Sequence, residues 1–272
     1  QSNSISQNNL TNDTIRDLTI SGVTGKGIEL YYSKNIVIEN CHIESTTEEG
    51  LYLYDCENVT VINCSFSDNR SGVVALFGSG IQVLNCQFLI PGHFDTIEAG
   101  NFIQFDKVTG AQNKINNNVG EATLGQSYPE DLISIYKSFG TQNSPIEVRG
   151  NKFRGGGPSI SGGGIMAGDV DGGNICVEDN ILVNPGQYGI AIASGSNIRI
   201  LNNKVYSKQQ PFTNVGIYVW NQSQAGCRGN EVKGNEVNFS DSTGNMNTHW
   251  DGGNCGIIDG WNTNDWNSSI DE

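Results

Sequence analysis

The segment Asn35-Ile-Val-Ile-Glu-Asn-Cys41 recurs along the chain as Asn58-Val-Thr-Val-Ile-Asn-Cys64 and Gly80-Ile-Gln-Val-Leu-Asn-Cys86. Each copy alternates apolar and polar residues, which is the period of a β-strand with one buried face. Degenerate copies end at Asn118 and Asn235. The other full copies are Pro145-Ile-Glu-Val-Arg-Gly-Asn151, Asn174-Ile-Cys-Val-Glu-Asp-Asn180 and Asn197-Ile-Arg-Ile-Leu-Asn-Asn203. The repetition predicts similar strands that follow one another at a regular spacing.

Each copy is accompanied by two further strand signals. One is a short apolar pair such as His42-Ile43, and the other is a Gly-Ile type strand such as Gly27-Ile-Glu-Leu-Tyr31 or Gly216-Ile-Tyr-Val-Trp220. Three strands make one triangular coil, which buries its apolar side only when coils stack. The sequence therefore predicts a solenoid of about nine coils, with equivalent residues directly above one another.

The last residue of each copy forms a predicted inward column at a tight turn. Asn tolerates the left-handed turn conformation and passes hydrogen bonds to the next coil, while Cys acts as a small buried apolar residue. This pattern of short repeats with an asparagine ladder resembles the pectin-lyase-like superfamily, over about Asn12 to Asn262. The resemblance implies an all-β fold, a single-domain right-handed parallel β-helix over residues 1–272. Residues 1–11 are expected to form an N-terminal extension, 12–237 regular coils, and 238–272 an irregular C-terminal coil and cap.

Composition narrows the partners. The formal net charge is −14, with 15 Lys and Arg against 29 Asp and Glu. A nucleic-acid partner needs a basic stripe, and an anionic membrane surface also favours a basic protein, so neither is expected. No apolar run is long enough for a spanning helix. The polar start at Gln1 suits a mature exported protein, so we expect a secreted or cell-surface location.

Cysteine and tryptophan positions give two structural expectations. Cys41, Cys56, Cys64, Cys86 and Cys176 fall on interior strand or turn positions and are expected to be free. Cys227 and Cys255 lie in the irregular C-terminal part and are candidates for a disulfide that seals the last coil. The tryptophans Trp250, Trp261 and Trp266 are expected to cap the apolar end of the solenoid, with a sugar-stacking platform as the alternative.

Three central coils are longer than the others and predict the position of a site. Insertions at Pro91–Gly100, Gly120–Glu130 and Gly155–Gly163 all precede the Gly-Ile type strand. Neighbouring loops at one corner would wall a groove over one sheet, which is where rigid scaffolds usually carry a site.

Alternation identifies the side chains that face this groove. Outward aromatic residues include Tyr54, Tyr218 and Trp220, whose rings suit the C–H faces of sugars or, alternatively, stabilise the solenoid by stacking. In the central coils Gln104, Ser134 and Tyr136 supply polar groups. We therefore predict that the groove binds a polysaccharide or oligosaccharide.

Two chemistries and one non-catalytic function compete. A lyase of uronic-acid polymers needs a base, and some members of the superfamily that the chain resembles use Lys or Arg, often with calcium. Lys107 and Lys137 are expected at equivalent strand ends on adjacent coils, with Asp169 at the same place one coil later. Lys137 or Lys107 would be this base, assisted by Arg154, with Asp169 and Asp171 as candidate Ca²⁺ ligands. Lys137 suits this role if partial burial near Lys107 lowers its pKa, whereas neighbouring carboxylates would make it an ion-pair residue.

A glycoside hydrolase instead needs two carboxyl groups, which Asp106, Asp131 and Asp169 could supply. A glycan-binding or structural β-helix on the cell surface needs neither set. We place first a lyase that acts by β-elimination on an extracellular uronic-acid polymer. The hydrolase and the non-catalytic protein are the alternatives.

Overall fold

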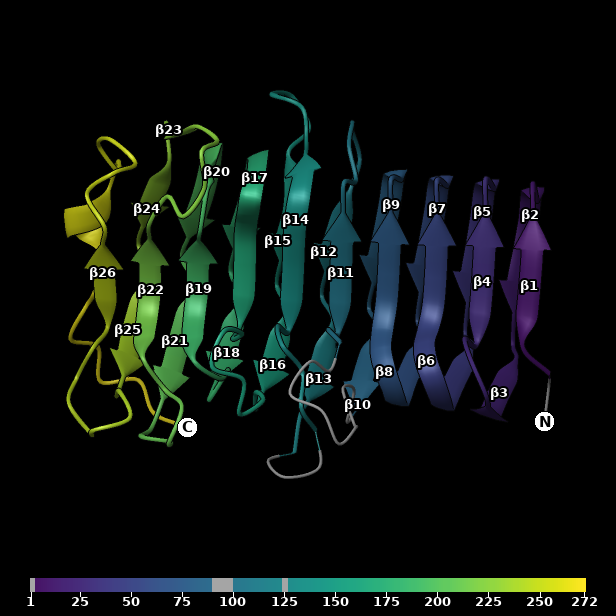
Figure 1. Ribbon diagram of the computed structural model, residues 1–272, viewed down its shortest axis with the longest axis horizontal. Coiled ribbons are helices and arrows are strands. Elements are labelled where there is room, and N and C mark those ends of the chain that lie inside the picture. Colours follow the sequence, from purple (N-terminus) through teal and green to yellow (C-terminus); the bar gives the residue numbers. More distant parts are fainter. Residues whose placement is uncertain (1–2, 90–99, 124–126) are drawn as a thin grey trace.

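The protein forms a parallel β-helix, seen in a computed structural model that describes residues 3–89, 100–123 and 127–272. Figure 1 shows the coils stacked along one axis, from β1 at one end to β26 at the other. All strand pairs that stack along the axis are parallel. In the described residues no helix is long and apolar enough to cross a membrane.

The strands form three faces. Sheet 1 faces the viewer in Figure 1 and carries ten strands within the described residues. They are β1 (Ile5–Asn8), β4 (Ile28–Tyr31), the ends of β6 (His42–Tyr54) and β8 (Ser65–Leu76), β11 (Ile103–Asp106), β14 (Ile133–Phe139), the start of β17 (Ile165–Glu178), β19 (Tyr188–Ile192), β22 (Val215–Val219) and β26 (His249–Asp251). One inner column of this sheet is Ile28, Leu51, Val73, Ile103, Ile133, Ile165, Ile190 and Ile217, all fully buried.

Sheets 2 and 3 complete the triangle. Sheet 2 contains β2 (Thr11–Arg16), β5 (Lys34–Glu39), β7 (Glu57–Ile62), β9 (Ser79–Leu84), β12 (Lys114–Asn116), β15 (Ile146–Arg149), the end of β17, β20 (Gly195–Leu201), β23 (Cys227–Arg228) and β24 (Glu231–Lys233). Sheet 3 contains β3 (Thr19–Val23), the starts of β6 and β8, β10 (Gln87–Leu89), β13 (Val119–Glu121), β16 (Lys152–Arg154), β18 (Ile181–Val183), β21 (Lys204–Ser207) and β25 (Glu236–Phe239). One 3₁₀ turn, η1 (Trp261–Thr263), follows β26.

The predicted asparagine ladder is confirmed at the turn from sheet 2 to sheet 3. Asn180 shows the pattern: its Oδ1 accepts from Asn151 N at 2.9 Å and Nδ2 at 2.8 Å, and its Nδ2 donates to Val148 O and Asn203 Oδ1. The same bonds link Asn118, Asn151, Asn180, Asn203, Asn235 and Asn264. The ladder residues from Asn118 to Asn235 are fully buried, so each bond satisfies a group that would otherwise be costly to bury.

Cysteines continue this column toward the N-terminus. Cys41, Cys64 and Cys86 occupy the ladder position and are buried and free, as are Cys56 and Cys176. Their thiols contact backbone carbonyls, as in the 3.4 Å contact from Cys41 Sγ to Glu39 O. The prediction of free interior cysteines is confirmed for Cys41, Cys56, Cys64 and Cys86. Cys176 is free and buried but lies in the outward column, in register with Glu147 and Arg199.

The two ends of the helix differ from the sequence-based boundaries. The predicted extension over residues 1–11 contains β1, which pairs in register with β4, because Ile5 and Ile28 point inward alike. Residues 238–272, predicted to be an irregular coil and cap, add a further coil to the helix. Within them β26 pairs with β22, and Asp259 and Asp265 make parallel bridges to Glu231 and Glu236.

A cap closes the C-terminal end. His249 takes the place of the inner isoleucines in the last strand of sheet 1, and its ring stacks on Trp266 with centroids 4.2 Å apart. Trp261 and Trp266 also pack against the apolar core. The predicted capping role is therefore confirmed for these two tryptophans, while Trp250 lies elsewhere.

Candidate functional site

A groove of about 440 Å³ lies over the C-terminal half of sheet 1. Its lining includes Asp131 and Asp169, the aromatic residues Tyr218, Trp220 and Trp250, and the loop residues Ile160 and Ser161. The predicted Gly155–Gly163 loop thus walls a groove at the expected corner. Of the other two loops, Pro91–Gly100 lies outside the described residues except for Gly100, and residues 124–126 of Gly120–Glu130 are outside them too.

Asp131 is the buried acid of this groove. Only 7% of the residue is exposed, and burial raises its pKa from the ordinary 3.8 to about 7. Its Oδ1 accepts hydrogen bonds from the Tyr188 hydroxyl and from Gly163 N at 2.9 Å, and both bonds work against this rise. Both bonds go to Oδ1, so among the described residues Oδ2 has no hydrogen-bond partner, and a proton on this carboxyl belongs there.

Tyr188 reaches Asp131 across an intervening coil. Asp131 precedes β14, Gly163 precedes β17 and Tyr188 begins β19, so the coil of Gly163 lies between the other two. A Cβ on Gly163 would lie 2.6 Å from Tyr188 O and 2.8 Å from its ring. Glycine at this position therefore leaves the space that the fully buried Tyr188 ring fills.

Asp169 is the second carboxylate. It lies on β17, in register with Tyr136 of β14, which is itself in register with Asp106 of β11. Burial raises the pKa of Asp169, opposed by a backbone hydrogen bond from Val170 and by the charge of Lys137. The negative charge of Asp169 contributes in turn to the raised pKa of Asp131. Two partly desolvated carboxyl groups thus face one groove.

Aromatic rings form the wall at the C-terminal end. Trp220 and Trp250 meet edge to face with centroids 5.4 Å apart, and Tyr218 stacks edge to face on Tyr188 at 5.4 Å. Trp220 is 40% and Trp250 46% exposed. Trp250 lies in register with Tyr218 on sheet 1, so it belongs to the groove, which was the alternative to its predicted capping role.

Sequence reasoning missed Tyr188, Glu130 and Met166, which line or support the groove. The signal for Tyr188 was its position directly before the Gly189-Ile190 strand, where the preceding coil has Gly163 before Gly164. Only the stacking of coils shows that a ring there extends toward a carboxylate two coils away.

The predicted polar residues divide between two places. Gln104 and Ser134 are consecutive members of the outward column that continues to Met166 and Tyr218. Gln104 lines a neighbouring depression, and Ser134 is buried between Gln104 and Met166. These residues therefore share the sheet of the predicted site.

Lys107 and Lys137 occupy equivalent left-handed turn positions on adjacent coils, as predicted, with φ values of 55° and 48°. Lys107 Nζ lies 3.2 Å from Asp106 Oδ1 and 4.8 Å from the Phe77 ring centroid. The Lys137 side chain forms a hydrogen bond with Tyr136. This bond raises the pKa of Lys137, and so do the charges of Asp106 and Asp169. A base at Lys137 needed a lowered pKa, whereas the raised pKa favours the charged form of this side chain. The ion pair is seen for Lys107, with Asp106.

Two predicted placements need correction. Asp169 was expected one coil after Lys137 at the same position, but it aligns with Tyr136, and Val170 takes the turn position. Arg154 was expected beside Lys137, but it lies on β16 of sheet 3 and forms an ion pair with Glu272. The reason is that residues 152–154 pair with β13 and β18, which form a different face.

Tyr54 lies on sheet 1 but at a distance from the groove. It contacts Tyr31, Tyr32 and Phe77, with centroid separations of 5.6 to 6.0 Å. Leu76, Asp106 and Tyr136 separate it from Asp169 along the same column. It therefore belongs to an aromatic cluster of the N-terminal coils.

The calcium site stays a prediction. Asp169 lines the groove, whereas Asp171 lines a separate depression with Lys107 and Lys137. The Asp171 carboxylate accepts from Gly172 N at 2.9 Å. Across the part of the chain that the structure describes, no group of three or more His, Cys, Asp or Glu side chains is arranged to hold a metal ion.

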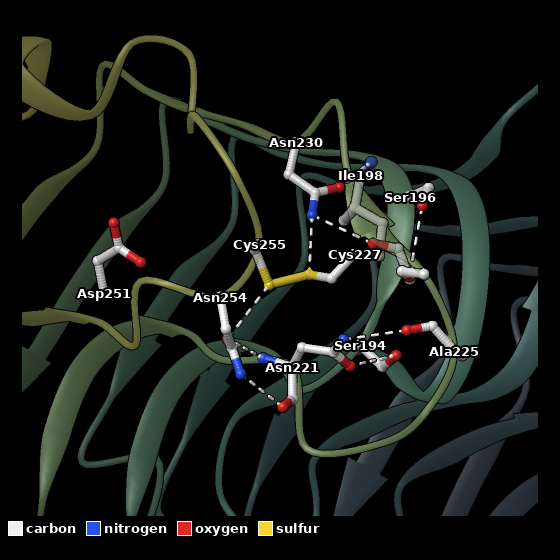
Figure 2. The surroundings of a disulfide bond; sticks show 12 residues. Ser194, Ser196, Ile198, Asn221, Ala225, Cys227, Asn230, Asp251, Asn254 and Cys255 are labelled. Carbon is white, nitrogen blue, oxygen red and sulfur yellow. Dashed lines mark hydrogen bonds between the residues drawn. A yellow bond between two sulfur atoms is a disulfide. The ribbon is translucent and has the colours of Figure 1, made fainter.

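The predicted disulfide between Cys227 and Cys255 is present (Figure 2). It joins the first residue of β23 to the turn after β26, so it fixes the coil that carries Trp250 to the preceding one. Asn254, next to Cys255, bonds in both directions with Asn221: its Oδ1 accepts from Asn221 N at 2.8 Å and its Nδ2 donates to Asn221 O at 2.9 Å. The disulfide and these hydrogen bonds thus hold the turn that follows the strand of Trp250.

Comparison with known proteins agrees with this architecture. The chain matches the family described as "Right handed beta helix region" over residues 3–166 and 131–257, so it belongs to that family. A search of curated proteins gave no match.

Three solved structures illustrate the likeness in fold. PfbA, a surface adhesin of Streptococcus pneumoniae, has 16% identity and a TM-score of 0.53, with 86% of this chain and 64% of that chain covered. The catalytic domain of a GH87 alpha-1,3-glucanase in complex with tetrasaccharides has 13% identity and a TM-score of 0.61, with coverage of 90% and 50%. A hyperthermoactive exopolygalacturonase from Thermotoga maritima has 11% identity and a TM-score of 0.51, with coverage of 78% and 49%. The chain thus spans less than two thirds of each, and at these identities the likeness concerns the fold alone.

Proposed function

We propose that the protein is a glycoside hydrolase that acts on a neutral polysaccharide, with Asp131 as the general acid and Asp169 as the second carboxylate. The observation that carries this proposal is the buried Asp131, whose pKa of about 7 keeps a proton available near neutral pH. A carboxyl group held protonated by burial, beside another carboxylate, is the arrangement that glycosidic bond cleavage uses.

The residues divide the reaction as follows. The proton on Asp131 Oδ2 passes to the glycosidic oxygen, which leaves as an alcohol when the bond to the anomeric carbon breaks. The oxygen of a water molecule ends on that carbon, and a carboxylate at Asp169 assists either by accepting the proton of this water or by bonding first to the carbon. Tyr188 and Gly163 N hold Oδ1 of the acid, which leaves Oδ2 directed at the substrate.

The lining of the groove supports a neutral sugar. The carboxylates of Glu130 and Asp169 line it beside the protonated Asp131, and their negative charges would repel an anionic polymer. Tyr218, Trp220 and Trp250 offer ring faces that suit sugar C–H groups. A uronic-acid lyase needs a cation to neutralise the substrate carboxylate. Arg154, which was expected to assist the base, lies on sheet 3 and is paired there with Glu272.

The disulfide supports export. Such bonds persist in oxidising compartments, so we propose that the protein works outside the cytoplasm, on the cell surface or in the medium.

The test is an assay of the purified protein on alpha-1,3-glucan, other neutral glycans and polygalacturonate. We expect new reducing ends from a neutral glycan, without the absorbance of an unsaturated product, and loss of this activity in Asp131→Asn. Formation of the unsaturated product from polygalacturonate would instead establish the lyase. Tight binding of a glycan without turnover would establish a non-catalytic glycan-binding protein, for which the exposed rings of Trp220 and Trp250 are the supporting observation.

A further inference from the structure

A second depression of about 580 Å³ lies on sheet 1 beside the groove, toward the N-terminus. Its lining includes Arg70, Asn101 and Gln104. It shares Glu130, Ile160 and Ser161 with the groove of Asp131, so the two depressions meet at these three residues. We call this second depression the Arg70 chamber and the shared residues the ridge.

The ridge is held by hydrogen bonds from several directions. Ser161 Oγ lies 3.3 Å from Glu130 Oε1, and Glu130 N donates to Gly100 O at 3.0 Å. The Gln187 side chain donates to the carbonyl of Ile160, whose side chain is 79% exposed. The ridge is therefore a fixed element that a bound chain must cross, and Asp131 follows Glu130 directly.

Hydrogen bonds link the lining of the Arg70 chamber to Asp131. Asn101 Oδ1 accepts a hydrogen bond from Asp131 N at 3.0 Å, and Asn101 Nδ2 donates to Gln104 Oε1 at 3.2 Å. The Gln104 amide N–H groups and the Arg70 guanidinium supply donors toward the chamber. Sugar hydroxyls accept such bonds, and a side chain that positions Asp131 is itself part of the chamber floor.

The two depressions lie along one column of sheet 1, which runs through Val74, Gln104, Ser134, Met166, Ala191, Tyr218 and Trp250. At about 4.8 Å per coil, the distance from Val74 to Trp250 is about 29 Å. This length accommodates several consecutive sugar rings, with Asp131 at the junction rather than at either end.

We propose that both depressions bind one polysaccharide chain, so that the protein cleaves an internal bond at the ridge. The Arg70 chamber then holds the part of the polysaccharide that lies toward the N-terminal end of the β-helix. This inference rests on the proposed hydrolase function and adds the mode of attack, which is endo-acting. The bond broken, the transferred proton and the water consumed are those of the hydrolysis described above.

The test uses alpha-1,3-gluco-oligosaccharides and oligogalacturonides of graded length, labelled at the reducing end. Wild-type protein is expected to release internal fragments from the start of the reaction. Arg70→Ala should raise the KM for long chains roughly tenfold and shift the cleavage positions, because a hydrogen bond to a charged group is lost. The matched control Arg228→Ala, on sheet 2 and outside both depressions, should leave KM and cleavage positions unchanged.

Release of single sugar units from one end, or a KM and cleavage pattern of Arg70→Ala equal to those of the control, would overturn the proposal that both depressions bind one chain. Absence of cleavage by wild-type protein would refute the hydrolase instead. In that case the affinities of Asp131→Asn protein for the same oligosaccharides test separately whether the Arg70 chamber binds part of the chain. Tighter binding of long chains, weakened by Arg70→Ala, supports it, and equal affinity for long and short chains contradicts it.

Discussion

The N-terminal coils and the later coils have the same backbone, and both carry exposed ion pairs between neighbouring coils, but they differ in the buried carboxyl group of Asp131. In the first coils, carboxylates pair with cations of neighbouring coils, as in Lys34–Glu57 at 2.9 Å and Arg16–Glu39 at 3.8 Å. These pairs are exposed and contribute little to stability. In the later coils Asp131 is buried and bonded to Tyr188, with no cation within salt-bridge distance among the described residues. A site therefore differs from scaffold in what surrounds its carboxylates.

The difference follows from the length of the corner between sheets 3 and 1. Short corners leave the outer face of sheet 1 open around Tyr54 and Phe77. The longer corner that ends at Gly163 brings Ile160 and Ser161 over the sheet, which removes water from Asp131 and raises its pKa. Loop length thus converts an ordinary outer face into a candidate active site.

The largest expected effect comes from the same substitution made in each region. Asp131→Asn should reduce turnover roughly 100- to 10,000-fold, the usual contribution of a general acid. The control Asp55→Asn changes an exposed carboxylate at a turn with φ of 51°, a conformation that Asn accepts, and should leave kcat unchanged. Equal kcat values for the Asp131 variant and the wild type would show that this carboxyl is not the acid.

The pH dependence of stability separates the buried carboxyl from the exposed ones. The folded-state pKa of Asp131, about 7, lies above its ordinary value of 3.8. Its contribution to stability is therefore fully present below pH 4 and is lost as the pH rises toward and through 7. The loss is roughly 4 kcal/mol. Denaturant unfolding of wild type and Asp131→Asn across this range should show the difference, and parallel curves would contradict the raised pKa.

The asparagine part and the cysteine part of the ladder column provide the next comparison. Asn180→Leu removes the acceptor of Asn151 N and the donor to Val148 O, both buried, and should cost about 4 kcal/mol. Cys64→Ala in the cysteine part removes a small buried side chain and the weak sulfur acceptor of Cys41 N at 3.4 Å, and should cost about 2 kcal/mol. Asp179→Gly, at the left-handed position beside Asn180, is the control and should be nearly neutral. Chemical denaturation measures all three, and equal costs in the two parts of the column would remove the distinction.

The smallest expected effect concerns the bond between Tyr188 and Asp131. Tyr188→Phe removes a donor that stabilises the charged carboxylate, so the pKa of Asp131 should rise further. The alkaline limb of the pH–rate profile should move to higher pH by about one unit, with kcat at low pH little changed. A limb that stays in place would assign Tyr188 to packing alone.

Much of the scaffold could be predicted because it depends on local pattern. The strands, the ladder from Asn118 to Asn235 and the disulfide between Cys227 and Cys255 were all expected, since period-two alternation and a repeated turn residue repeat in the sequence itself. The ends were harder: Ile5–Asn8 forms a strand inside the expected extension, because its register partner, Ile28, is distant in sequence.

The site could be predicted only in part, and Asp131, Asp169, Tyr218 and Trp220 were found through alternation and loop position. Arg154 was misplaced because a shift of a few residues moves a side chain to another face of the triangle. Tyr188 was missed because its partner lies two coils away, across a glycine.

The sequence by itself determined the solenoid and its inward column, because both repeat from coil to coil. It also determined the face on which a groove would form, because three consecutive insertions interrupt the repeat at one corner. Only the tertiary structure decided which carboxylate is buried, which tryptophan joins the groove and which cation pairs elsewhere. Those properties depend on stacking between residues far apart in the chain, where burial and hydrogen bonding set the pKa and local pattern carries no record of either.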